Sequence, residues 1–237
     1  MKNSIYHIAM IDLLWVCIPV VIMMLIYFRW TKDKFTIPYA LIRMLTQLIL
    51  IGYVLTYIFN SNSSYLIILI LCVMLITGSI IALRPLQKKN RSLYLYAFIS
   101  ISIGGIFTLS MVIFGVLHLT PWYEPKFLIP LSGMIFANAM NSVSIAAERF
   151  ESETVEKNNN YIHSRAISYK AAFIPTINAL FAVGLVSLPG MMTGQILSGV
   201  DPLIAVRYQM MVMLMILGSS GISVAIYLSL LKSKTNV

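Results

Sequence analysis

The 237-residue chain is far more apolar than a soluble protein. Apolar side chains make up 59% of it, and Asp, Glu, Lys and Arg together make up only 11%, whereas a soluble domain has roughly 45–50% and 25%. The net charge of +9 would favour a nucleic-acid-binding protein only if the basic residues formed one polar surface, and they lie instead between apolar runs. Composition therefore excludes a soluble domain, favours an integral membrane protein in contact with lipid, and gives no reason to expect a nucleic-acid partner.

Long apolar runs recur over the whole chain, and each is long enough to cross a hydrocarbon core of about 30 Å as a helix. The runs are apolar on every side and do not alternate in polarity, which excludes a transmembrane β-barrel. We therefore predict an all-α, polytopic membrane protein that forms a single transmembrane domain over residues 1–237. Seven helices are expected near 7–28, 39–59, 64–83, 93–118, 128–147, 171–199 and 202–231.

Basic residues are unevenly distributed between the predicted connections. The first, third and fifth connections and the C-terminal tail hold most of the 17 Lys and Arg residues, whereas Lys2, Lys126 and Arg207 fall on the opposite face. Because basic loops stay in the cytoplasm, this asymmetry predicts an external N-terminus and a cytoplasmic C-terminus. The expected location is the plasma membrane, the cytoplasmic membrane of a bacterium.

The sequence contains no motif of a known catalytic class. It has no Walker A pattern, no H-E-x-x-H and no G-x-S-x-G, and its three histidines are dispersed. Cys17 and Cys72 lie in separate predicted spans, which excludes a C-x-x-C metal site. The 15 methionines could ligate a soft metal, although methionine is also a common apolar filler. We expect no catalytic residues and no cofactor, and the sequence identifies no metal ligands.

Polar residues inside the predicted spans are the strongest clue to a transport path, because burying them in lipid is costly unless they face a partner, the helix bundle or water. Hydrogen bonding between helices is the simpler explanation for each of them. The candidate path residues are Gln47, Asn138, Asn141, Asn178 and Gln209.

The predicted sixth helix, 171–199, contains a break. Pro189 removes a hydrogen-bond donor and Gly190 loosens the backbone, so the helix should be interrupted there. Counted from Ala171, the break lies roughly 27 Å along the helix, near the predicted outer mouth. It could form a gate or could simply end the helix. The residues concerned are Leu188, Pro189, Gly190, Met191 and Met192.

Residues 148–170 are predicted to form the one long cytoplasmic connection, with four acidic and four basic side chains. A connection of this length can form an amphipathic element and dock a partner protein, although a solvated linker would need no partner. The candidate docking residues are Glu148, Arg149, Ile162, Arg165 and Tyr169.

Three motifs in the sequence are similar to those of the FetB-type permeases. They are Arg43-x3-Gln47-Leu48-x3-Gly52-Tyr53, Ile129-Pro130-x2-Gly133-Met134-x3-Asn138-Ala139-Met140, and Gly184-Leu185-Val186-Ser187-Leu188-Pro189-Gly190-Met191-Met192-Thr193-Gly194 followed by Gly199-x-Asp201-Pro202 and Tyr208-Gln209. The resemblance covers residues 36 to 230, and the third motif is the most specific.

This family resemblance implies a seven-helix permease of an ABC transporter, associated with iron export in bacteria and with aluminium tolerance in plant relatives. It implies a dimer of permeases and a separate cytoplasmic ATPase, which would hydrolyse the ATP. Residues 148–170 depart from the family pattern, because they are shorter and lack its glycine- and proline-containing coupling element. The alternative is a membrane sensor, immunity or assembly factor that kept the permease fold without transporting a solute.

Overall fold

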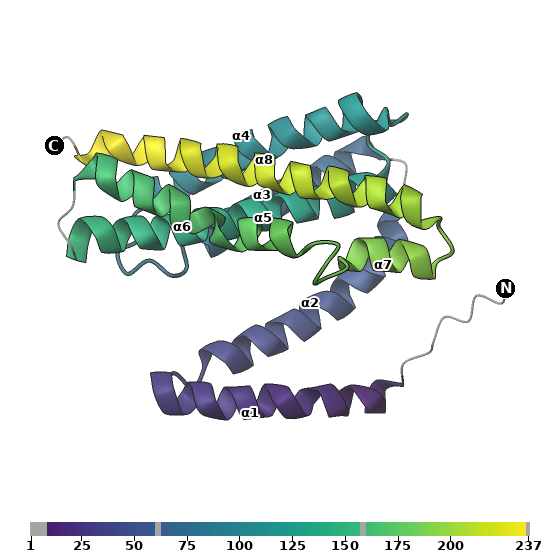
Figure 1. Cartoon of the computed structure of the whole chain (residues 1–237), viewed down its shortest axis with the longest axis horizontal. Coiled ribbons are helices and arrows are strands. Elements are labelled where there is room, and N and C mark those ends of the chain that lie inside the picture. The colour runs from purple at the N-terminus through teal and green to yellow at the C-terminus, as the bar shows by residue number, and fades with distance from the viewer. Residues whose placement is uncertain (1–8, 60–62, 157–159, 236–237) are drawn as a thin grey trace. The chain divides into compact units, whose positions relative to one another are not determined.

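The computed structural model describes residues 9–59, 63–156 and 160–235, and most of these residues are helical (Figure 1). The chain divides into two compact units, Met1–Ser61 and Asn62–Val237. Six helices among the described residues are long and apolar enough to cross a membrane. They span Leu13–Thr31, Thr36–Thr56, Ser64–Ala82, Arg91–Leu117, Pro125–Val155 and Pro202–Lys232. The prediction of an all-helical, polytopic membrane protein is thus confirmed.

The first unit is a pair of helices joined by a short, capped connection. A 3-10 turn, η1 (Met10–Asp12), leads into α1 (Leu13–Thr31), and α2 (Thr36–Phe59) follows. The Asp33 carboxylate accepts hydrogen bonds from the backbone N–H groups of Phe35 and Thr36, at 3.1 and 3.2 Å. Hydrogen bonds from Thr36 and then Phe35 lower the pKa of this exposed carboxyl. Asp33 thereby satisfies donors that the first turn of α2 would leave unpaired.

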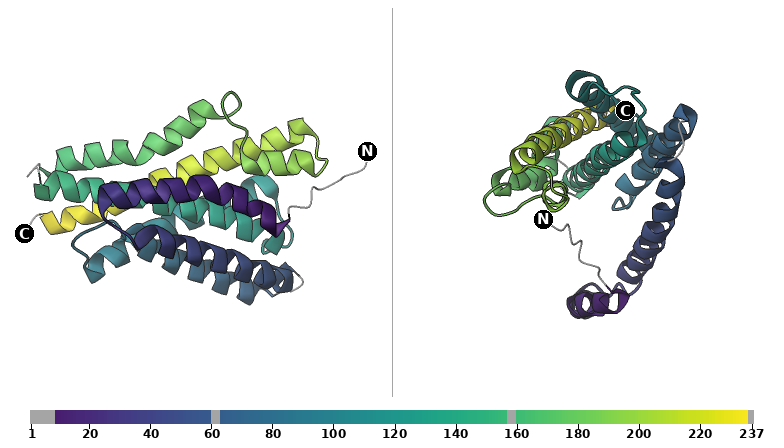
Figure 2. Two further views of the ribbon diagram at one scale, coloured as in Figure 1. Left: turned by 90° about the horizontal axis from the view of Figure 1, so that it is seen from below. Right: turned by 90° about the vertical axis from the view of Figure 1, so that its right-hand side faces the viewer.

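The second unit is a bundle of helices that run beside one another in alternating directions (Figures 1 and 2). Two of them continue into π-helical stretches, η2 and η3. In chain order the elements are α3 (Ser64–Ala82), α4 (Arg91–Ser110), η2 (Met111–Leu117), α5 (Pro125–Glu151), η3 (Ser152–Glu156), α6 (Tyr161–Ala182), α7 (Gly190–Leu197) and α8 (Pro202–Thr235).

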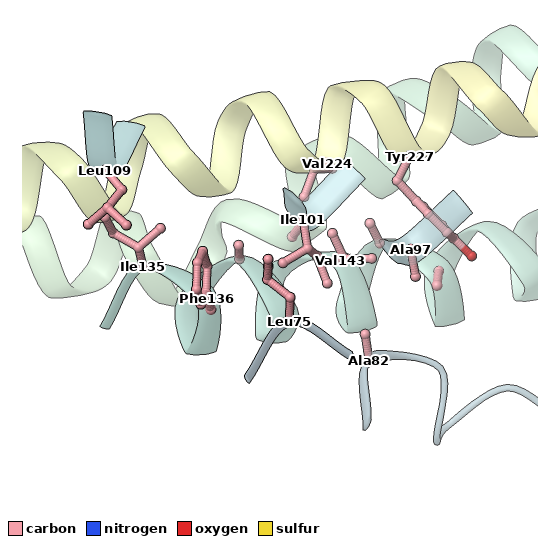
Figure 3. Close-up of a cluster of buried hydrophobic side chains, with 14 of the residues drawn as sticks. Leu75, Ala82, Ala97, Ile101, Leu109, Ile135, Phe136, Val143, Val224 and Tyr227 are labelled. Atoms are coloured by element: carbon pink, nitrogen blue, oxygen red, sulfur yellow. The ribbon is translucent and has the colours of Figure 1, made fainter. Parts of the chain in front are cut away.

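Helix α5 is the centre of this bundle and packs against α3, α4, α6 and α8. Its buried Ile135 and Val143 meet Leu75 of α3, Ile101 of α4 and Val224 of α8 in one continuous core (Figure 3). Since lipid is as apolar as these side chains, close packing rather than water exclusion holds such helices together.

Helices α4 and α8 approach each other closely at Gly104. A Cβ atom on Gly104 would lie 2.9 Å from the backbone nitrogen of Ser223 and 3.0 Å from the carbonyl oxygen of Ser219. Ser219 and Ser223 are themselves fully buried. A residue without a side chain is therefore required at position 104, as in other close crossings of membrane helices.

The connection expected at 148–170 is mostly helical, which corrects that prediction. Helix α5 continues to Glu151 and its π-helical extension to Glu156, and α6 already begins at Tyr161. The segment contains no glycine or proline to stop a helix. Arg149 and Glu153, four residues apart, form an ion pair at 2.7 Å that supports the extension. The charged residues of this segment were predicted to form a connection, although they extend α5 and begin α6.

The helix expected over 171–199 also differs from the structure. Helix α6 covers Tyr161–Ala182, and residues 183–189 separate it from the short α7. The predicted break exists, but it begins several residues before Pro189. Because α6 starts at Tyr161, Ala171 is no longer a valid origin for the predicted distance along the helix.

Helix α6 is the one expected span missing from the six apolar helices, because Arg165, Lys170 and several Ser, Thr and Asn residues lower its hydropathy. It nevertheless runs along the bundle against α5 and α8 (Figure 1). Seven crossings, and the orientation in the membrane, remain predictions.

Candidate functional site

Helices α5, α6 and α8 enclose a cavity of about 400 Å³, which we call the asparagine cavity. Asn138 and Asn141 of α5 and Thr176 of α6 supply much of its polar surface, and Met213 of α8 closes one side. The Asn138 amide nitrogen donates to the Met134 carbonyl at 2.8 Å, which fixes the orientation of this side chain. Neutral oxygen ligands from two helices thus face one space.

A second cavity, of about 430 Å³, lies between the end of α6, the 183–189 segment, α7 and α8, and we call it the break cavity. Its wall is largely apolar and includes Met192 and Met210. Gln209 is the polar exception: it is only 6% exposed, and its buried Oε1 has no hydrogen-bond partner among the described residues. A buried acceptor of this kind is costly unless a donor or a cation reaches it.

Met213 lines both cavities. Gln209 and Met213 are four residues apart, so they project from the same face of α8. The two cavities therefore adjoin at one flexible thioether side chain, and together they form the candidate path.

The segment between α6 and α7 is a hydrogen-bonded turn. The Ala182 carbonyl accepts from the N–H groups of Val186 and Ser187, at 2.8 and 3.1 Å, and the Gly184 N–H donates to the Ser187 carbonyl at 3.0 Å. Gly184 has φ +84°, a conformation that only glycine adopts readily. Gly184 therefore turns the chain after α6, five residues before Pro189.

The rest of the third sequence motif shapes the next two helix starts. Pro189 is the N-cap of α7, and its carbonyl accepts from the Thr193 N–H at 3.0 Å. Gly199 has φ +89° after the end of α7. Asp201 then caps α8 by accepting from the Leu203 N–H at 2.8 Å. The motif thus encodes a break after α6, followed by a short helix, α7.

Three of the five candidate path residues line these cavities: Asn138 and Asn141 line the asparagine cavity, and Gln209 lines the break cavity. Asn178 is exposed on α6 and lines neither cavity, and Gln47 belongs to the first unit. Of the candidate gate residues, Leu188, Pro189 and Met192 line the break cavity, whereas Gly190 and Met191 begin α7 without lining it.

Sequence reasoning assigned no role to Thr176, Gly184 or Met213. Thr176 and Met213 reach the path only through the packing of α6 and α8 against α5. The spacing of Met213 from Gln209 was a usable signal, because residues four apart share a helix face.

The candidate docking residues lie at the other end of the bundle. Ile162 is 68% exposed and Tyr169 is 40% exposed, and the exposed Arg165 lies on the same side of α6, opposite the buried Ser164 and Ser168. Glu148 is exposed on α5. Arg149 differs from the other four, because its guanidinium is paired with the buried Glu153.

No group of three or more His, Cys, Asp or Glu that could hold a metal ion occurs among the residues searched, 9–59, 63–156 and 160–235. A cation in the two cavities would meet amide and hydroxyl oxygens and methionine sulfur instead. Such neutral ligands suit passage better than permanent binding, since conduction requires weak sites.

Comparison with known proteins gives several relatives at about one-third identity. The chain is 34% identical to the UPF0014 membrane protein slr1647 of Synechocystis over 76% of its own length and 75% of the relative's. It is 32% identical to the Probable iron export permease protein FetB of Escherichia coli, over 79% and 77%. It is 30% identical to Protein ALUMINUM SENSITIVE 3 of Arabidopsis thaliana, over 78% and 71%.

No solved structure matches the chain. The family model described as "Uncharacterised protein family (UPF0014)" matches residues 10–235. This match includes every helix that the structure describes in both units. Together with the six apolar helices, it confirms a multi-pass membrane protein with permease relatives, and the chain belongs to the UPF0014 family.

Proposed function

We propose that this chain is the permease subunit of an ABC transporter that exports a metal ion, iron in the first instance, across the plasma membrane. The observation that carries the proposal is the pair of adjoining cavities at Met213, one lined by asparagines and one holding the unpaired acceptor of Gln209. The relative named as a probable iron export permease supports the choice of substrate. The proposed role is transport and not catalysis.

The chemistry of the cavities fits a cation that moves between sites. Amide and hydroxyl oxygens can replace part of the water shell of an ion, and thioether sulfur binds softer or borderline ions. In the proposed path, an ion passes from the oxygens of Asn138, Asn141 and Thr176 across Met213 to Gln209. The apolar wall of the break cavity strengthens the contact at Gln209 by excluding water.

Exchanging the path amides for leucine should reduce transport. Asn138→Leu and Gln209→Leu should each lower ATP-dependent iron flux by roughly tenfold, the change that corresponds to about 1.4 kcal/mol of lost interaction with the moving ion. Flux is measured in proteoliposomes that contain the permease and its ATPase, with protein abundance matched.

Asn178→Leu is the matched control, because it removes an exposed amide that lines neither cavity. Its flux should equal that of the parent. Equal flux in all three variants would remove these cavities from the path, and no iron flux in the parent protein would refute iron as the substrate.

The proposed transporter also contains a second permease copy and a cytoplasmic ATPase pair, which would dock on α6. Ile162 and Tyr169 are exposed apolar residues in the first half of α6. Ile162→Asp with Tyr169→Asp should abolish co-purification of the ATPase in mild detergent, because two unpaired charges would be buried on docking. Val186→Asp with Leu197→Asp makes the same change at exposed positions near α7 and should leave co-purification intact. Retained binding in the α6 variant would move the interface elsewhere.

A further inference from the structure

A third cavity, of about 680 Å³, lies where the α3–α4 connection meets the ends of α5 and α8. We call it the basic-end cavity, because Lys88, Lys89 and Arg91 all line it. It is larger than either path cavity and shares no lining residue with them. The proposed transport path gives it no role.

The position of the basic residues is fixed by Glu151 at the end of α5. Its carboxylate accepts hydrogen bonds from the backbone N–H groups of Gln87 and Lys88, each at 3.1 Å and each to a different oxygen. These two bonds hold the α3–α4 connection against α5. They also partly satisfy the one carboxylate that lines the cavity.

The floor and the rim of the cavity differ in character. Leu86, Phe150, Tyr227 and Leu231 are buried and form an apolar floor, and the Tyr227 ring reaches down from α8 toward the neighbouring helices (Figure 3). Lys88, Lys89 and Arg91 are exposed at the rim. The ion pair among the described residues joins Arg149 to Glu153. None of the three rim cations pairs with an acidic side chain within 63–156 and 160–235.

A ligand that satisfies both parts must carry a negative head group and an apolar tail. Inorganic phosphate would leave the apolar floor empty. An acidic loop of a protein would bind the basic rim but would not fill the apolar floor. A bilayer supplies both parts in one molecule, and the cavity lies at the ends of helices that cross it. Basic pockets between membrane helices bind anionic lipid head groups in this way.

We propose that the basic-end cavity binds one anionic phospholipid, with its phosphate between Lys88, Lys89 and Arg91 and an acyl chain along Leu86, Phe150 and Leu231. The bound lipid would fill the space between α4, α5 and α8 at this end of the bundle. The proposal stands independently of the transported solute, because it concerns a different cavity and a different ligand.

The test is native mass spectrometry of the purified chain with phosphatidylglycerol or phosphatidylcholine added. The parent protein should retain one phosphatidylglycerol at least tenfold more strongly than phosphatidylcholine. Lys88→Gln with Lys89→Gln and Arg91→Gln should abolish this preference. Arg29→Gln with Lys32→Gln and Lys34→Gln removes the same charge from the first unit and should preserve it.

A cavity-filling variant separates a built site from surface electrostatics. Leu93→Trp leaves every charge in place but occupies part of the cavity, so it should also displace the lipid. The substitutions at the rim, in the first unit and at Leu93 are all at exposed or half-buried positions. Thermal unfolding checks that the variants are folded.

Four outcomes would overturn the proposal. Equal loss in the Arg29, Lys32 and Lys34 variant would mean general charge attraction, and full binding in the Leu93→Trp variant would mean that the cavity is not used. Displacement of the lipid by soluble glycerol phosphate alone would mean that only the head group is held. Loss of ATPase binding in the Lys88, Lys89 and Arg91 variant, with lipid binding unchanged, would mean that the cavity is a protein interface.

Discussion

Gly104→Ala should strongly destabilise the folded protein. The new Cβ would lie 2.9 and 3.0 Å from backbone atoms of Ser223 and Ser219, and backbone atoms cannot rotate away as a side chain can. Helices α4 and α8 must therefore separate along a crossing in which Ser219 and Ser223 are fully buried. Overpacking of this kind costs about 1–3 kcal/mol, and a backbone clash belongs at the upper end of that range.

The measurement is thermal unfolding in mild detergent, together with the yield of monodisperse protein. Gly218→Ala on α8 is the matched control, because a Cβ there would meet no atom within 4 Å. That variant should unfold at or above the parent temperature. Combining Gly104→Ala with Ser223→Gly removes the buried hydroxyl but not the backbone contacts, so it should recover only part of the loss. Parent-like unfolding of Gly104→Ala would disprove the close crossing.

Gly184→Ala should disable the break between α6 and α7 without any steric clash. A Cβ at this position would meet no atom within 4 Å, but φ is +84°, where a side chain costs about 1–3 kcal/mol of backbone strain. The turn held by the Ala182 carbonyl should therefore open and distort the break cavity. We expect iron flux in proteoliposomes to fall by roughly tenfold or more, in line with about 1.4 kcal/mol for each factor of ten.

Two variants distinguish strain from a general effect of substitution. Gly190→Ala adds the same methyl group in the first turn of α7, again with no atom within 4 Å and without a positive φ, so flux should persist. Gly184→Asn should retain more activity than Gly184→Ala, because asparagine tolerates a positive φ better than alanine does. If all three variants transport at the parent rate, the turn has no part in transport.

Much of the fold could be predicted from the sequence because membrane helices are long and continuously apolar. The same reasoning failed where a helical segment is charged or where an apolar segment is not helical. Residues near Arg149 and Glu153 are charged yet helical, since a half-buried ion pair stabilises them. Val183 to Leu188 are largely apolar yet not helical, since Gly184 turns the chain.

The candidate path could be predicted only in part. Asn138, Asn141 and Gln209 were found because polar groups within apolar runs are costly and stand out. Asn178 looked equivalent in the sequence, but it is exposed on α6 and lines neither cavity. Met213 was missed because a methionine in an apolar run has no distinguishing polarity. Its position between the cavities depends on how three helices pack.

The length of α8 has a mechanical consequence. Its 34 residues, Pro202–Thr235, extend roughly 51 Å as one rod with no internal proline. Gln209 and Met213 lie near its start, and Tyr227 and Leu231 lie near its end. A sliding or rolling of this rod shifts the walls of all three cavities at once. A displacement at one end of α8 would thereby reach its other end without any change in the chain between them.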